Sequence, residues 1–241
     1  MTRCDMEKVL KQLVERLNKA YGERLVSAVL YGSAAVGDHD GRFSDINILC
    51  VLREVTPREL GESAGIFHWW RQLGNPSPLL FGLEELRGST DCFPIEFQDI
   101  RERHRILFGE DVVKDLEVGK VFYRAQVEHE LRAKLLRLRQ KAAGVIPEKD
   151  LLVELLADSL STFSVLFRHA LLLHGGEAAF EKRRVLEQAV ERFGIEPSPF
   201  RTLLDLREKK IKAREIQAGP LLDEYLKQIR VVVDAVDRLE K

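Results

Sequence analysis

Apolar residues at steps of three and four open the chain. Val9, Leu10, Leu13 and Leu17 recur between polar positions, a pattern that predicts an amphipathic helix ending near Gly22. The next apolar runs are shorter and rich in β-branched residues, at residues 25–31 and 46–52, with a turn-rich segment between them. We expect two strands that pair as a hairpin-like unit.

Four further elements are predicted before the chain becomes helical throughout. Residues 56–73 have helical character, with Thr56 as the cap and Pro57 at the first helical position. Residues 78–81 predict a third strand. Residues 93–97 alternate between apolar and polar side chains and predict a fourth strand, followed by a short helix around residues 100–104.

Beyond about residue 118 the sequence predicts long helices only. One apolar stripe consists of Val127, Leu131, Leu135 and Leu138, and a second of Leu222, Tyr225, Ile229, Val232, Val236 and Leu239. Residues 151–173 are apolar on nearly every side, which is typical of the central helix of a bundle. We therefore expect an α+β domain with a mixed sheet and flanking helices over residues 1–118. An all-α bundle of four or five helices follows over residues 119–241.

The charge of the chain is balanced, with 38 Lys and Arg against 39 Asp and Glu and a net charge of -1. Nucleic acid is therefore not indicated as a partner, and any basic contact must be local. The three cysteines, Cys4, Cys50 and Cys92, are an odd number without metal-ligand spacing. This argues against a disulfide framework and a structural zinc site.

No membrane segment or targeting leader is predicted. The N-terminal twenty residues mix polar with apolar positions, and the most apolar stretch, residues 150–174, carries Glu154, Asp158 and Arg168. We expect a cytoplasmic protein without a membrane partner.

The candidate chemistry lies between residues 30 and 49. A strand that ends in Gly32-Ser33 allows close backbone approach, and the following N–H groups with the Ser33 hydroxyl are suited to hold phosphate oxygens. In the next strand, period-two alternation places Asp45 and Asn47 on one face, expected to be polar. Ile46 and its partners lie on the other face, expected to be buried.

A second carboxylate is expected opposite the first. On the predicted strand at residues 93–97, Glu96 has the parity opposite to the buried residues, so it is expected to face Asp45. Two carboxylates beside a phosphate-holding turn predict a Mg²⁺ site, because this ion prefers oxygen ligands and bridges carboxylates to phosphates.

Together these motifs resemble the signature of the polymerase β-like nucleotidyltransferase superfamily. Gly32-Ser33, a spacer with Gly37, Ser44-Asp45-Ile46-Asn47 and a later Glu96 match its pattern of Gly-Ser, Asp-x-Asp or Asp-x-Glu, and a third carboxylate on a strand. The resemblance is closest to small bacterial nucleotidyltransferases that append a helical bundle, such as aminoglycoside and lincosamide adenylyltransferases.

The resemblance implies a transfer reaction on a nucleoside triphosphate. Asp45, Asn47 and Glu96 would hold Mg²⁺, or Mn²⁺ in its place, and Asp45 and Glu96 would be catalytic. Gly32, Ser33, Arg42 and Ser44 would bind the nucleotide, ATP or another triphosphate. A nucleoside monophosphate would pass to a hydroxyl of an unidentified small-molecule or protein acceptor.

One position departs from the family pattern, because Asn47 stands where the second carboxylate is expected. An amide oxygen still ligates Mg²⁺ but lacks the charge, and a unit-charge pair about 4 Å apart is worth about 4 kcal/mol at an effective dielectric constant of about 20. Three outcomes stay open: a slow enzyme with one firmly held ion, recruitment of Asp38, Asp40 or Asp99, or nucleotide binding without turnover.

Further alternatives remain at this stage. Asp99 would replace Glu96 if the strand register differs, and Arg42 is either a γ-phosphate ligand or a solvated loop arginine. The competing function is a nucleotide-binding or partner-binding module of the same fold. Pairing of two copies as a homodimer is also left open.

Overall fold

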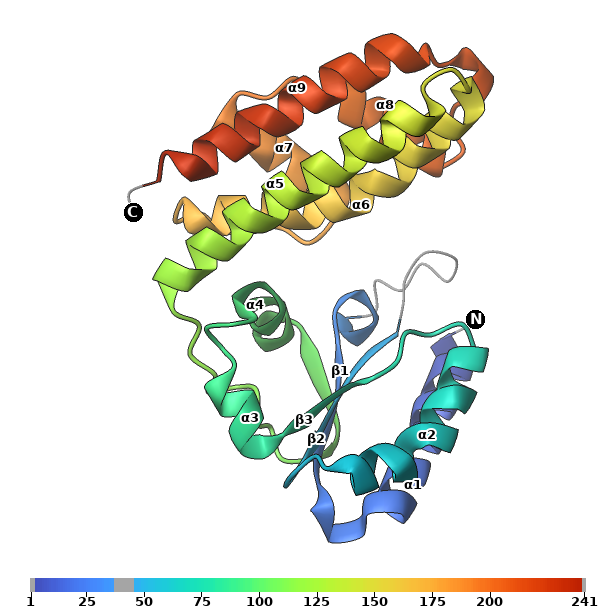
Figure 1. Cartoon of the computed structure of the whole chain (residues 1–241), viewed down its shortest axis with the longest axis vertical. Coiled ribbons are helices and arrows are strands. Elements are labelled where there is room, and N and C mark those ends of the chain that lie inside the picture. The colour runs from blue at the N-terminus through green and yellow to red at the C-terminus, as the bar shows by residue number, and fades with distance from the viewer. Residues whose placement is uncertain (1–2, 37–45, 240–241) are drawn as a thin grey trace. The chain divides into compact units, whose positions relative to one another are not determined.

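A four-stranded mixed sheet organises the N-terminal half of the chain. The computed structural model describes residues 3–36 and 46–239, and the chain divides into two units, Met1–Gly119 and Lys120–Lys241 (Figure 1). The strands are β1 (Leu25–Tyr31), β2 (Asn47–Leu52), β3 (Leu79–Gly82) and β4 (His104–Gly109). Their order is β3-β2-β1-β4, with β1 antiparallel to both neighbours and β2 parallel to β3.

Helices cover both faces of this sheet. The helices α1 (Arg3–Tyr21) and α2 (Pro57–Gln72) lie on one side, whereas α3 (Leu83–Gly88) and α4 (Pro94–Glu102) lie on the other (Figure 1). Period-two alternation decides which core each strand residue joins: Ile48 and Cys50 pack with α1 and α2, and Leu49 packs with α4. Both faces are therefore apolar over most of their length.

The predicted helix at residues 56–73 is confirmed together with its cap. The Thr56 hydroxyl accepts a hydrogen bond from the Arg58 N–H at 3.2 Å, and the Glu59 carboxylate accepts one from the Thr56 N–H at 3.2 Å. This reciprocal pair satisfies N–H groups that the first helical turn leaves unbonded. Pro57 occupies the first helical position, where its missing N–H costs nothing.

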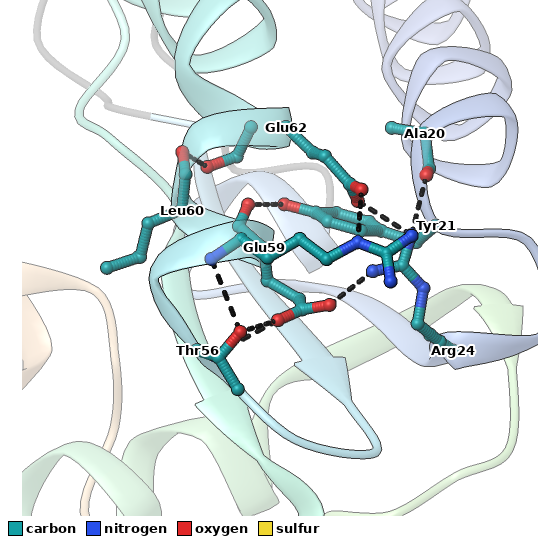
Figure 2. A network of polar contacts seen from close by, with 9 residues as sticks. Ala20, Tyr21, Arg24, Thr56, Glu59, Leu60 and Glu62 are labelled. Carbon is teal, nitrogen blue, oxygen red and sulfur yellow. Dashed lines mark hydrogen bonds and ion pairs between the residues drawn. The ribbon is translucent and has the colours of Figure 1, made fainter.

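The same carboxylate joins α2 to the end of α1. The Arg24 guanidinium bonds Glu59 on one side and Glu62 at 2.6 Å on the other, while the Tyr21 hydroxyl donates to the Glu59 carbonyl at 3.1 Å (Figure 2). Glu59 is only 5% exposed, so its charge requires these partners. Hydrogen bonds from Thr56 first, and from Arg24 among others, lower the pKa of Glu59 to about 2.

The predicted strand at residues 93–97 is wrong, whereas the short helix predicted around residues 100–104 is confirmed in part. Phe93 caps α4 and residues 94–97 form its first turn; the helix continues to Glu102, and the strand β4 begins at His104. Pro94 at the first position of α4, with Phe97 and Ile100 buried at steps of three, explains the helix. Over so few residues, the apolar positions fit both the two-residue period of a strand and the 3.6-residue period of a helix.

The second unit consists of helices within the described residues. They are α5 (Lys120–Val145), α6 (Lys149–Leu173), α7 (Lys182–Phe193), α8 (Ser198–Arg207) and α9 (Ala218–Asp237), with a short 3-10 turn, η3 (Ala213–Glu215). The predicted stripes on α5 and α9 are buried, apart from Leu239, which lies past the end of α9. The helix α6 is buried on most sides, as expected, and contacts all four other helices. None of the described helices has the apolar length to cross a bilayer.

Gly109 at the end of β4 provides a test of the sheet. It has φ of 76°, and a Cβ atom there would lie 2.0 Å from the Val26 carbonyl oxygen of β1. We expect Gly109→Ala to lower the free energy of unfolding of the first unit by more than about 3 kcal/mol, because backbone must move. Both tryptophans, Trp69 and Trp70, lie on α2, so urea unfolding followed by tryptophan fluorescence reports on this unit.

Gly22→Ala is the matched control. Gly22 also has positive φ, at 54°, but nothing lies within 4 Å of an added Cβ atom. Its expected cost is about 1 kcal/mol, from the left-handed backbone alone. Equal losses in the two variants would contradict the contact between β1 and β4 at Gly109.

The network around Glu59 predicts a dependence of stability on acid pH. Because folding lowers the pKa of Glu59 to about 2, its contribution is complete above the ordinary pKa of about 4.5 and is lost as the pH falls toward 2. Glu59→Gln should be less stable than the parent protein at pH 7. The difference in fluorescence-monitored unfolding should shrink toward pH 2, while the exposed-site control Glu15→Gln keeps the acid dependence of the parent protein. A difference independent of pH would refute the assignment.

Candidate active site

The end of β1 brings together part of the predicted site. Gly32 follows β1 directly with φ of 78°, and the 3-10 turn η2 (Ser33–Val36) begins at the next residue. The Gly32 N–H donates to the Arg103 carbonyl at 3.1 Å, and its carbonyl accepts from the Ala35 N–H at 3.1 Å. The bend is therefore fixed to the junction between α4 and β4, and the Gly32 N–H is used inside the protein. Phosphate contacts from this turn would come from later N–H groups.

Asn47 lies against this bend. It is the first residue of β2, and its Nδ2 atom is 3.4 Å from the position that a Cβ atom on Gly32 would occupy. A Cβ atom at position 32 would only be in van der Waals contact with Asn47, so the positive φ is what favours glycine there. The predicted proximity of Gly32 and Asn47 is what the structure shows.

Tyr31 connects Asn47 to α4. It is the register partner of Asn47 across β1 and β2, and of His104 across β1 and β4, so Tyr31 and Asn47 lie on the same face of the sheet. Burial, and to a smaller extent the negative charge of Glu96, together raise the pKa of Tyr31 to about 12. Its hydroxyl therefore stays protonated and able to donate at neutral pH. The sequence could have indicated Tyr31 as a site residue, because the alternation of side chains along β1 predicts which face of the sheet it lies on.

Glu96 reaches this region from a helix instead of a strand. It lies in the first turn of α4 and is exposed, so the prediction that a strand carries Glu96 is wrong. Its electrostatic effect on Tyr31 nevertheless places its charge near the end of β1. Asp99 follows three residues later, so both carboxylates share one side of α4.

The face that carries Asn47 is polar only at its end. Leu49 and Val51 continue that face of β2 and are fully buried beneath α4, contrary to the expectation of a polar face. No residue of the four described strands is Asp or Glu. Within residues 3–36 and 46–239, no three His, Cys, Asp or Glu side chains form a group able to hold a metal ion.

The remaining predicted residues are Arg42, Ser44 and Asp45, with the alternatives Asp38 and Asp40. All five lie outside the described residues. For Ser33, the structure describes the backbone, at the first position of η2. Two surface hollows of about 750 and 320 Å³ flank α1, and neither is lined by Gly32, Asn47 or Glu96.

Comparison with known proteins identifies the fold. Neither a protein-family model nor a curated protein matches the chain. Among solved structures, it is similar to spectinomycin adenyltransferase AAD(9) from Enterococcus faecialis, crystallised with ATP and spectinomycin. The TM-score is 0.57 at 12% identity, and the match covers 95% of this chain and 98% of that chain. The chain thus has the fold of a polymerase β-like nucleotidyltransferase, a mixed sheet with flanking helices followed by a helical region, as its motifs predict.

Proposed function

We propose that the chain is a metal-dependent nucleotidyltransferase. It binds a nucleoside triphosphate, with ATP as the donor, at the end of β1 and transfers a nucleoside monophosphate to a hydroxyl of a small-molecule or protein acceptor. One observation carries the proposal: Asn47 lies against the Gly32 bend, with Tyr31 beside it and the charge of Glu96 close by. ATP is bound by the protein of similar fold.

The donor set fits one Mg²⁺ ion better than two. Asn47 supplies a neutral amide oxygen, Glu96 supplies a carboxylate, and we assign a second carboxylate to Asp45. Mg²⁺ is commonly held by one or two carboxylates together with substrate phosphates, so a third acid is not required for one ion. An ion held there would neutralise charge on the triphosphate and on the departing pyrophosphate.

The residues of the chain have separate parts in this proposal. The turn that begins at Gly32 holds the triphosphate through backbone N–H groups and the Ser33 hydroxyl, with Arg42 and Ser44 beside the phosphates. Glu96 accepts the proton of the acceptor hydroxyl. Tyr31, the register partner of Asn47, helps to orient the site through its protonated hydroxyl.

A second candidate is a nucleotide-binding module without turnover. It is favoured by the absence of Asp and Glu from the four described strands, since the family pattern places its third carboxylate on a strand. Both candidates use the same turn and differ in whether pyrophosphate is released.

The placement of Glu96 can be tested without a ligand. Because the charge of Glu96 raises the pKa of Tyr31, Glu96→Gln should lower that pKa. Difference absorbance of tyrosinate over an alkaline titration measures the shift, and Tyr31→Phe identifies which of the four tyrosines is responsible. The exposed-site control Glu84→Gln should leave the curve unchanged. Identical curves for Glu96→Gln and the parent protein would remove Glu96 from the site.

Calorimetry and pyrophosphate release test the transfer reaction. Titration of ATP should give binding that strengthens with Mg²⁺, and incubation should release pyrophosphate. Glu96→Gln should keep ATP binding in the absence of Mg²⁺, weaken the gain that Mg²⁺ brings, and lower the release rate by about a hundredfold or more, as expected for loss of a general base. Asn47→Asp should tighten Mg²⁺ binding, because it adds charge beside the ion.

The outcomes separate the two candidates. Binding without release in both the parent protein and Asn47→Asp would favour the module. Absence of ATP binding in the presence of Mg²⁺ would overturn both candidates.

A further inference from the structure

The loop between α8 and α9 carries a concentration of positive charge. Among residues 208–217, Lys209, Lys210, Lys212 and Arg214 are exposed, against two carboxylates, Glu208 and Glu215. The whole chain has a net charge of -1, so this excess is local. We call residues 208–217 the basic loop.

The backbone of the basic loop is well defined and strained. The Lys209 N–H donates to the Leu206 carbonyl at 3.0 Å, and the Lys210 N–H to the Asp205 carbonyl at 2.8 Å, which is the Schellman arrangement at a helix C-terminus. The residue in the left-handed position of this motif is usually glycine, but here it is Lys209, with φ of 60°. Among the described residues it is the only non-glycine residue with positive φ.

Three of the four basic side chains of this loop are exposed and form no ion pair with a described residue. Within residues 3–36 and 46–239, no hydrogen bond or ion pair involves the side chains of Lys209, Lys212 or Arg214. Lys210, in contrast, contacts Glu208 at 2.7 Å. Lys149 of α6 adds a further charge to the same surface, because its Nζ donates to the Arg214 carbonyl at 2.9 Å.

The composition of the surface favours phosphate over protein as the partner. Protein interfaces are depleted in Lys and enriched in aromatic residues and Arg, whereas the basic loop is rich in Lys and carries no exposed large apolar side chain. Lysine is a compact point charge suited to single phosphate contacts. Without an aromatic residue on which bases would stack, the loop matches a duplex backbone better than a single strand. The absence of exposed apolar residues also argues against membrane insertion.

We propose that the basic loop binds the phosphodiester backbone of a nucleic-acid duplex through Lys209, Lys212 and Arg214, without reading its sequence. The left-handed Lys209 places a charge at the helix end, where glycine would be less strained but neutral. With about three phosphates contacted, the logarithm of the binding constant should fall with the logarithm of salt concentration with a slope of about -3.

Charge reversal in the loop tests this proposal. The probe is a short fluorescein-labelled DNA duplex, with an RNA duplex of the same sequence as a second probe, and binding to the full-length chain is followed by fluorescence anisotropy at low salt. Lys212→Glu combined with Arg214→Glu should weaken binding by about tenfold or more and flatten the salt dependence.

The matched control makes the same change in net charge elsewhere in the same unit. Arg137→Glu combined with Lys141→Glu alters two exposed residues of α5 that have no ion pair within the described residues. This variant should keep affinity within about threefold of the parent protein. An equal loss in both double variants would overturn the proposal, since net charge alone would then explain binding.

Lys209→Gly distinguishes an effect on binding from an effect on folding, because it should raise stability and lower duplex affinity. Relief of the left-handed strain should raise the thermal midpoint of the second unit by a few degrees, measured by circular dichroism at the helical band, while duplex binding weakens. A midpoint that does not rise, or an affinity that does not fall, contradicts the role assigned to Lys209.

Binding of other ligands to the full-length chain, compared with binding of the two duplexes, completes the test. Binding of DNA and RNA duplexes with similar affinity supports backbone recognition. Tighter binding of a single strand, of an acidic peptide or of vesicles containing an anionic lipid than of either duplex would overturn it.

Discussion

Double pairing of β1 is the constraint on which the first unit depends. This strand bonds to β2 on one edge and to β4 on the other, and its side chains enter the cores on both faces of the sheet. A strand buried in this way has no freedom to shift, because a slip of one residue would exchange its two faces. Its end, at Tyr31 and Gly32, is therefore fixed in space. The candidate site uses that fixed point.

The bend after β1 is stabilised from outside its own hairpin. The bond from the Gly32 N–H to the Arg103 carbonyl fixes the turn to the segment where α4 passes into β4. The helix that carries Glu96 and the turn that carries Ser33 thus share one backbone contact. A carboxylate on α4 can therefore lie near the bend without being carried by a strand.

Charge is placed in two different ways in the two units. In the first unit, Arg24, Glu59 and Glu62 satisfy one another, so that a buried carboxylate stabilises the junction of α1 and α2 (Figure 2). In the second unit, the basic loop leaves Lys209, Lys212 and Arg214 without ion pairs to described residues, and it accepts backbone strain at Lys209. Paired charge stabilises structure, whereas exposed and strained charge is typical of a surface that binds.

The sequence by itself determined the elements whose signals are local. The stripe on α1, the runs that form β1 and β2, and Thr56 with Pro57 at the start of α2 are each confirmed, because periodicity and capping act within a few residues. Of the predicted site, the described residues show the proximity of Gly32 and Asn47, which follows from the pairing of β1 with β2. The alternation of Phe93, Ile95 and Phe97 misled, since a short apolar run fits either period.

Tertiary structure decided what depends on partners distant in sequence. Only packing against β1 determines that residues 104–109 form an edge strand, and only α4 above the sheet determines that Leu49 is buried while Asn47 stays near the surface. The use of the Gly32 N–H by Arg103 is likewise invisible in the chain. Local propensity sets which conformations a segment favours, but the burial and hydrogen bonds that choose among them come from segments far away in sequence.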